Sequence, residues 1–145
     1  MNDLLEMGKQ ILAAQPFSVH VGAEITAFNQ GTAELTISVA PQLMQQHGFV
    51  HGGVLSYAAD NALTFAGGSV LGPNVLTSEY KINYLKPAKG DKIISRATVI
   101  HTGRTQAVCR CEVFSDTRGD RVLCAVAQGT ITAMAGASEK QQKIG

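Results

Sequence analysis

A histidine followed by two glycines, His51-Gly52-Gly53, precedes an alanine-rich segment and is the part of this sequence best suited to chemistry. Glycines at the start of a helix let a ligand approach the backbone without meeting a Cβ atom. They also leave N–H groups pointing outward at the positive end of the helix dipole. Such a turn can bind phosphate or stabilise an oxyanion. A tight turn that only leads into a helix would have the same sequence.

Asp60 lies further along the same segment, among mostly apolar residues. Burying a carboxylate in such a setting is costly unless it is paired or exposed. Ser56, Asp60 and Thr64 are each four residues apart, so on a helix they form one narrow polar stripe. The stripe contains no Lys, Arg or Glu, the usual residues of a solvated helix face. This composition favours the wall of a polar pocket that faces a second subunit.

A metal site is not indicated. His47 and His51 are four residues apart, but the glycines at 48, 52 and 53 argue against a helix through both, and no third ligand follows at a typical spacing. Three cysteines are present, Cys109, Cys111 and Cys124. We interpret them as small buried hydrophobic residues, because a Cys-x-Cys pair alone is weak support for zinc.

Several charged residues are expected near strand ends. Lys86, Lys89, Lys92 and Arg104 are either solvated strand-end charges or phosphate contacts for a long anionic ligand. The tripeptide Arg118-Gly119-Asp120 is interpreted as a turn.

Composition limits the function classes. The chain has 145 residues, of which 45% are hydrophobic and 16% charged, so we expect one folded domain over residues 1–145. The net charge of +1 speaks against nucleic-acid binding. Apolar runs are too short for a membrane span, and the first residues are acidic where a signal peptide is basic. We therefore expect a soluble, cytoplasmic protein with no membrane or nucleic-acid partner.

Hydrophobic spacing and turn residues predict two helices and six strands. A short helix over residues 2–15 should end at Pro16, because the residue before a proline is pushed out of the helical region. A helix over residues 52–69 is apolar nearly all round and therefore buried, and Gly67 and Gly68 should close it. Strands are predicted over residues 23–29, 33–39, 75–85, 93–101, 105–115 and 122–134, with a hairpin turn at 29–31 and a polar tail over 135–145.

This order predicts an α+β domain with a core over residues 17–134. One antiparallel sheet of about six strands must bury its apolar face, and the long helix is the only element that can cover it. The sheet should therefore curl around that central helix. Because one helix covers only part of such a sheet, we expect an oligomer.

The residues together resemble the hotdog-fold acyl-CoA thioesterases, in the PaaI-like and 4-hydroxybenzoyl-CoA thioesterase branch. The resemblance rests on His51-Gly52-Gly53, the acid nine residues after the histidine, the alanine-rich helix, and a strand that ends in Tyr84-Leu85-Lys86-Pro87-Ala88. It covers residues 17–134. It implies hydrolysis of an aromatic or medium-chain acyl-CoA, without a cofactor, in a homodimer or a dimer of dimers (a homotetramer).

The resemblance also implies roles for individual residues. The N–H of Gly52 would polarise the thioester carbonyl, while His51 and Gly53 would shape the turn. Asp60, from the partner subunit, would act as nucleophile or general base. We expect Ser56 and Thr64 to give this acid a polar setting.

Three further residues match the family pattern at single positions. Gln45 would contact the thioester or hold a water molecule, Thr77 would position the attacking water, and Arg104 would face the nucleotide end of CoA. No Ser-His-Asp triad is implied, and the chain has no Gly-x-Ser-x-Gly motif.

The same fold would also suit two other functions. A hydroxyacyl-thioester dehydratase would place a histidine before a proline-rich turn, which residues 47–53 lack. A non-catalytic acyl-CoA binding or sensor module would not require a carboxylate facing the thioester. The set of Gln45, Gly52, Asp60 and Thr64 therefore favours hydrolysis.

Overall fold

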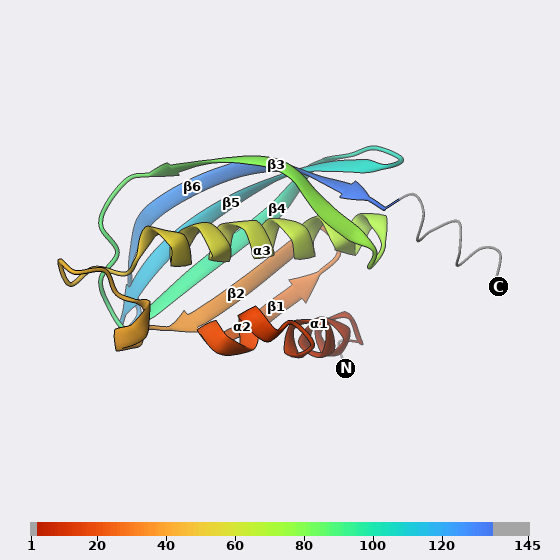
Figure 1. The fold of residues 1–145 in the computed structure, drawn as a ribbon. Coiled ribbons are helices and arrows are strands. Elements are labelled where there is room, and N and C mark those ends of the chain that lie inside the picture. Colours follow the sequence, from red (N-terminus) through yellow and green to blue (C-terminus); the bar gives the residue numbers. More distant parts are fainter. Residues whose placement is uncertain (1–2, 135–145) are drawn as a thin grey trace.

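The computed structural model describes residues 3–134, so the predicted tail over 135–145 lies outside the described residues. Three α-helices and six strands follow one another along the chain (Figure 1). In order, they are α1 (Asp3–Ala13), α2 (Pro16–Val21), β1 (Ala23–Asn29), β2 (Thr32–Ser38), α3 (Gly52–Leu71), β3 (Val75–Tyr84), β4 (Lys92–Thr102), β5 (Gln106–Thr117) and β6 (Asp120–Ala133), with a 3₁₀ turn over Pro41–Leu43.

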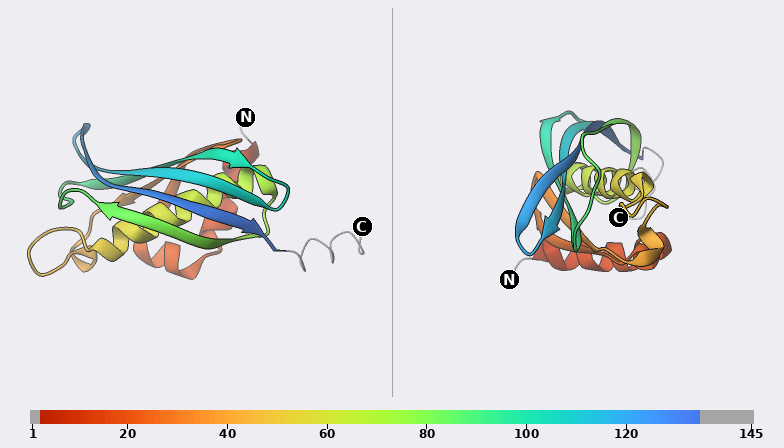
Figure 2. Two further views of the ribbon diagram at one scale, coloured as in Figure 1. Left: turned by 90° about the horizontal axis from the view of Figure 1, so that it is seen from above. Right: turned by 90° about the vertical axis from the view of Figure 1, so that its left-hand side faces the viewer.

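The strands form one antiparallel sheet in the order β1-β2-β4-β5-β6-β3, which confirms the predicted fold class. The sheet curls around α3, and α1 and α2 lie beside β1 at one edge of the sheet (Figures 1 and 2). On α3, eight residues are buried, among them Ala59, Ala62 and Leu63, which are fully inaccessible. The predicted buried helix is therefore present, and β3 forms one free edge of the sheet.

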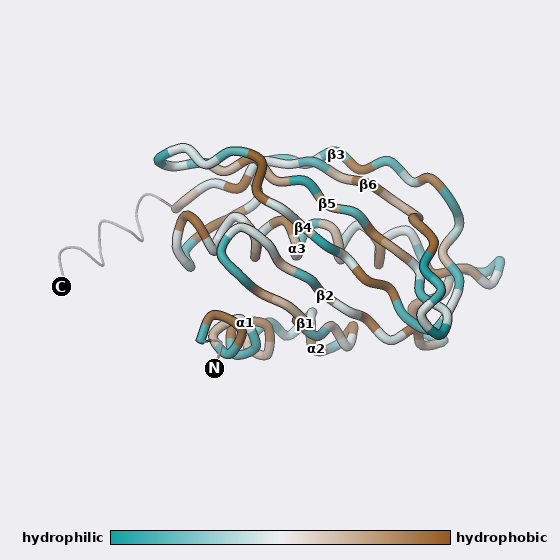
Figure 3. The backbone as a smooth tube through the Cα atoms, turned by 180° about the vertical axis from the view of Figure 1, so that it is seen from behind, coloured by the Kyte–Doolittle hydropathy of each residue, from teal (hydrophilic) through white to brown (hydrophobic). Residues whose placement is uncertain are grey.

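Hydrophobic and hydrophilic residues alternate along the strands (Figure 3), and in β5 buried residues alternate with more exposed ones. Cys109, Cys111 and Cys124 lie on the inner side as buried free thiols, as predicted. Burial raises the pKa of Cys109 to about 11 and that of Cys111 to about 12. These two thiols are therefore protonated and unreactive near neutral pH.

The first helix differs from the prediction around Pro16. The chain does leave the helix there, but Pro16 begins a second helix, α2, because proline is well suited to a first helical position. Ser18 of α2 is buried and accepts hydrogen bonds from Tyr57 (2.5 Å) and Asn61 (3.4 Å) of α3. Gln15 accepts from both Ser18 (2.5 Å) and Asn61 (3.1 Å). This network holds the N-terminal helices against α3.

The predicted end of the long helix at Gly67 and Gly68 is wrong, since α3 continues to Leu71 and Gly72 caps it with a φ of 106°. Gly67 serves packing instead. A Cβ atom there would lie 2.6 Å from the Cβ of Ile131 on β6, so only glycine lets the helix approach the sheet this closely.

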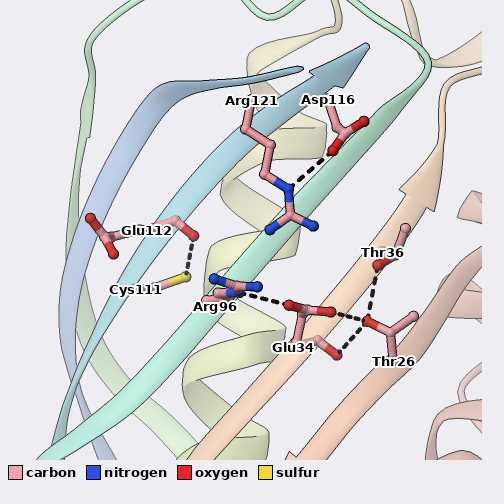
Figure 4. Close-up of polar contacts among 8 residues, drawn as sticks. All are labelled: Thr26, Glu34, Thr36, Arg96, Cys111, Glu112, Asp116 and Arg121. Atoms are coloured by element: carbon pink, nitrogen blue, oxygen red, sulfur yellow. Dashed lines mark hydrogen bonds and ion pairs between the residues drawn. The ribbon is translucent and has the colours of Figure 1, made fainter. Parts of the chain in front are cut away.

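The outer face of the sheet carries paired charges, with α3 on the opposite side (Figure 4). Arg96 bonds Glu34 at 2.7 Å, and Arg121 bonds Asp116 at 3.0 Å. Burial raises the pKa of Glu34, but hydrogen bonds from Thr26 and Arg96 outweigh it and leave that pKa below its usual value. These charges pair with one another, and the sheet separates them from the predicted site.

Among residues 3–134, no helix is long and apolar enough to cross a bilayer.

Candidate active site

The start of α3 presents one free backbone donor. His51 is the N-cap residue, and its Nδ1 accepts the N–H of Gly53 at 2.8 Å. A Cβ atom on Gly53 would lie 2.9 Å from that nitrogen, so glycine is required for this cap. The N–H of Gly52 has no hydrogen-bond partner within residues 3–134. Of the two glycine donors, the structure therefore leaves Gly52 available for a ligand at the positive end of a 20-residue helix.

The surroundings of Gly52 are open. A Cβ atom there would meet only the ring of Tyr84, at 3.5 Å, and the Tyr84 hydroxyl donates to the Gly52 carbonyl at 3.2 Å. A shallow groove beside Gly52 is lined by Gln45, Phe49 and Lys86, among others. Gln45 lies in the loop before α3, and its side-chain oxygen accepts the backbone N–H of His47. A ligand with a long arm could thus reach the Gly52 N–H along this groove.

Asp60 is partly exposed, and its carboxylate is held from β3. The hydroxyl of Thr77 donates to Asp60 Oδ1 at 2.7 Å. Thr64 contributes to the expected polar setting of Asp60, whereas the hydroxyl of Ser56 is directed to another partner. Thr64 donates to the backbone carbonyl of Asp60 at 2.8 Å, as helical threonines often do, and its oxygen lies 2.9 Å from that of Thr77. Ser56 bonds Tyr80 instead.

The polar stripe of α3 therefore faces the edge strand β3. Gly52 meets Tyr84, Ser56 meets Tyr80, and Asp60 meets Thr77. Sequence reasoning gave neither tyrosine a role in the site. Tyr80 was missed because it is three residues from Thr77, and the two would point to opposite faces of a regular strand.

A bulge between Thr77 and Glu79 brings Thr77 and Tyr80 to the same face. Gly129 on β6 lies opposite, and a Cβ atom there would be 2.6 Å from both the Glu79 carbonyl and Tyr80 Cβ. An isolated glycine within a strand is the sequence signal that could have revealed this bulge.

One chain does not bring all predicted site residues together. Gly52 and Asp60 are eight residues apart on α3, which separates them by about 12 Å along the helix axis. Arg104 lies in the turn between β4 and β5, beside the C-terminal end of α3 rather than its start. Three other residues, Gln45, His51 and Gly53, lie at the start of α3, whereas Thr64 and Thr77 surround Asp60. No group of three or more His, Cys, Asp or Glu within residues 3–134 could hold a metal ion.

Loss of the His51 cap should cost stability. We expect His51→Ala to lower the free energy of unfolding by about 1 kcal/mol, because the Gly53 N–H loses its acceptor. Urea denaturation followed by circular dichroism measures this change. His47→Ala is the matched control, since His47 is exposed four residues earlier. An equal loss in both variants would show that the His51 side chain does not cap the helix.

Proteins of known family are similar to this chain in sequence. The family model described as the thioesterase superfamily matches residues 47–122, just over half of the chain. A putative esterase of Haemophilus influenzae is 32% identical over 115 residues, which are 78% of this chain and 81% of that protein. The acyl-coenzyme A thioesterase PaaI of Escherichia coli is 32% identical over 96 residues, 66% of this chain and 68% of that protein.

Solved structures agree with the sequence relatives. The crystal structure of a thioesterase family protein from Silicibacter pomeroyi matches with a TM-score of 0.85 at 32% identity, covering 90% of this chain and 98% of that one. The matched region of the family model includes the start of α3 and Asp60. The chain therefore belongs to the thioesterase superfamily and is a thioester hydrolase with the hotdog fold.

Proposed function

We propose that this protein hydrolyses acyl-CoA thioesters at a site built from two copies of the chain. The observation that carries this proposal is the separation of the two functional groups. Gly52, with its free N–H, and Asp60, with its carboxylate, are eight residues apart, which separates them by about 12 Å along the axis of one helix. A single thioester needs its oxyanion donor at about 3 Å and its attacking group at about 3–3.5 Å. Asp60 of one copy and Gly52 of the other can meet both requirements.

The edge strand β3 supports such a pairing. It is the last strand of the sheet, so one side of its backbone has no neighbouring strand among residues 3–134. An exposed edge of this kind is a template for pairing with another chain. Leu76 on β3 is 61% exposed, which adds apolar surface at the same edge. A homodimer, or a dimer of two dimers, would cover this edge, and a monomer that persists in light scattering would contradict the shared site.

In the proposed reaction, the Gly52 N–H stabilises the negative charge that develops on the thioester oxygen. The Asp60 carboxylate takes a proton from a water molecule that attacks the carbonyl carbon, or it attacks that carbon itself and the resulting acyl-aspartate is then hydrolysed. In both routes the C–S bond breaks, the sulfur leaves as CoA thiolate, and one water molecule is consumed. Thr77 holds the carboxylate at 2.7 Å and would help to position the attacking water.

The groove beside Gly52 supports CoA as the leaving group. It leads past Gln45 and Phe49 to Lys86, and Lys89 lies over the Phe49 ring at 5.1 Å. In this proposal the Gln45 amide contacts the thioester. The phosphates of CoA would lie near these lysines, and Arg104 of the partner would contact the nucleotide end.

Thiol release from a panel of acyl-CoAs tests the proposal. Acetyl-, octanoyl-, benzoyl- and phenylacetyl-CoA would each be incubated with the wild type while a thiol reagent reports free CoA. We expect turnover that depends on the acyl group. No release from any member, together with tight binding of acyl-CoA, would instead identify a non-catalytic binding module.

A further inference from the structure

Two hydroxyl side chains, Ser56 on α3 and Tyr80 on β3, bond each other, and the proposed reaction uses neither. Both residues are half-buried, and neither hydroxyl makes another hydrogen bond within residues 3–134. A pair of hydroxyls has two protons, of which only one lies between the two oxygens. Each copy of the chain therefore keeps one hydroxyl proton for a partner outside itself.

This hydroxyl pair lies halfway between the two groups of the proposed site. Ser56 is four residues after Gly52 and four before Asp60, so it is about 6 Å from each along the axis of α3. Thr77 of β3 bonds the Asp60 carboxylate. Seven residues later, Tyr84 bonds the Gly52 carbonyl, so β3 runs antiparallel to the polar stripe of α3. The pair is thus the midpoint of the stripe and of the strand segment beside it.

Two-fold symmetry places this midpoint opposite its own copy. In a symmetric dimer, when one residue contacts a second residue of the partner, the second residue also contacts the first of the partner. The proposed site brings Gly52 of each copy to Asp60 of the other, so the two stripes run antiparallel across the axis. The residue halfway between them, Ser56, then faces the same residue of the other copy. Two β3 edges that pair about this axis are antiparallel for the same reason.

From this symmetry we infer that the two Ser56–Tyr80 pairs of a dimer form one cluster of four hydroxyls on the two-fold axis, between the two active sites. This inference rests on the proposed function, because it starts from the shared site. Within the cluster each hydroxyl donates one hydrogen bond and accepts one, so the spare proton of each copy is used.

The cluster determines how the two helices are aligned. Hydrogen bonds are directional, so they fix one register where apolar contacts alone would allow several. That register sets the position of Gly52 in each copy relative to Asp60 of the other. Ser56 and Tyr80 are therefore positioning residues rather than catalytic residues.

Cysteine cross-linking tests the position of the axis. The full-length Ser56→Cys variant would be oxidised, or treated with a short bismaleimide, and separated on a non-reducing gel. Facing cysteines can be bridged only at short range, so we expect about ten times more covalent dimer than from the wild type, whose three cysteines are buried. Thr64→Cys is the matched control. It lies on the same stripe eight residues further along, so its two copies would be about 24 Å apart along the helix axes.

Glu79→Cys gives a second cross-linking site, on β3, in case Ser56→Cys does not fold. Glu79 is exposed and directly precedes Tyr80, so the antiparallel β3 edges bring its two copies close to the same axis. We expect this variant to form covalent dimer as well.

Subunit exchange tests the hydrogen bonds themselves. Tyr80→Phe removes the two bonds that cross the axis, so the subunits should separate about 30-fold faster. Energy transfer after mixing donor-labelled and acceptor-labelled protein measures this rate. Tyr57→Phe is the control, because the Tyr57 hydroxyl bonds Ser18 within its own chain and its loss should leave the exchange rate unchanged.

The outcomes separate this inference from the proposed function. If Ser56→Cys and Glu79→Cys both cross-link no better than the control, the cluster is overturned, even in a protein that hydrolyses acyl-CoA. An exchange rate that Tyr80→Phe leaves unchanged would also overturn it. Cross-linking and faster exchange in a protein that hydrolyses no acyl-CoA would confirm the cluster and overturn the proposed reaction.

Discussion

Replacing Asp60 by Asn should lower kcat for acyl-CoA hydrolysis by about three orders of magnitude, because an amide cannot accept the proton of water or attack a carbonyl. Asn has the shape of Asp and keeps an oxygen that can accept the Thr77 hydroxyl, now at 2.7 Å from Asp60. The fold should therefore be retained, and so should the affinity for S-octyl-CoA, a thioether that the enzyme cannot hydrolyse. Thiol release measures the rate, and calorimetry measures the binding.

Asp91→Asn is the matched control for this variant. Asp91 is an exposed acid before β4, and its hydrogen bonds within residues 3–134 are made by its backbone, so its side chain can change without effect on the site. Turnover by Asp60→Asn within tenfold of the wild type would show that the carboxylate is not the catalytic group. Mass spectrometry after rapid quenching of the wild type distinguishes the two routes, because attack by Asp60 leaves an acyl group on its peptide.

Replacing Gly52 by Pro should lower kcat by about 100- to 1000-fold, the typical cost of losing one oxyanion donor. This position allows a specific test. Gly52 is the first residue of α3, where proline is tolerated, and no intrahelical bond within residues 3–134 uses its N–H. His51 has φ −59° and ψ 136°, a conformation that also suits the residue before a proline. The substitution therefore removes the donor while the helix remains.

Gly52→Ala is the companion variant, because it keeps the N–H and adds one methyl group in ordinary contact with the Tyr84 ring. We expect it to slow hydrolysis less than Gly52→Pro and to affect kcat more than KM. Thermal unfolding should show that both variants fold. If folded Gly52→Pro turned over at the wild-type rate, the oxyanion would have to be stabilised elsewhere.

Local features of the sequence were enough to predict the helices, the strands and the type of chemistry. Local periodicity predicts the alternating strands and the one helix that is apolar nearly all round. The Gln30-Gly31 turn depends on glycine's freedom at positive φ, since Gly31 has a φ of 88°. The start of the helix could be predicted from His51-Gly52-Gly53. Whether a backbone N–H at a helix N-terminus is free depends only on residues nearby in the sequence. These features are predictable because their causes lie within a few residues of one another.

What surrounds the acid, and how far α3 extends, depend on long-range packing. Thr77, rather than Ser56 or Thr64, bonds the Asp60 carboxylate, and the bulge between Thr77 and Glu79 puts Thr77 on the same face of β3 as Tyr80. Gly67 lies inside α3, and the absence of a side chain there makes room for Ile131. Both outcomes depend on residues more than 15 positions apart in the chain. Local periodicity carries no information about such contacts, because they join segments that are far apart in the sequence.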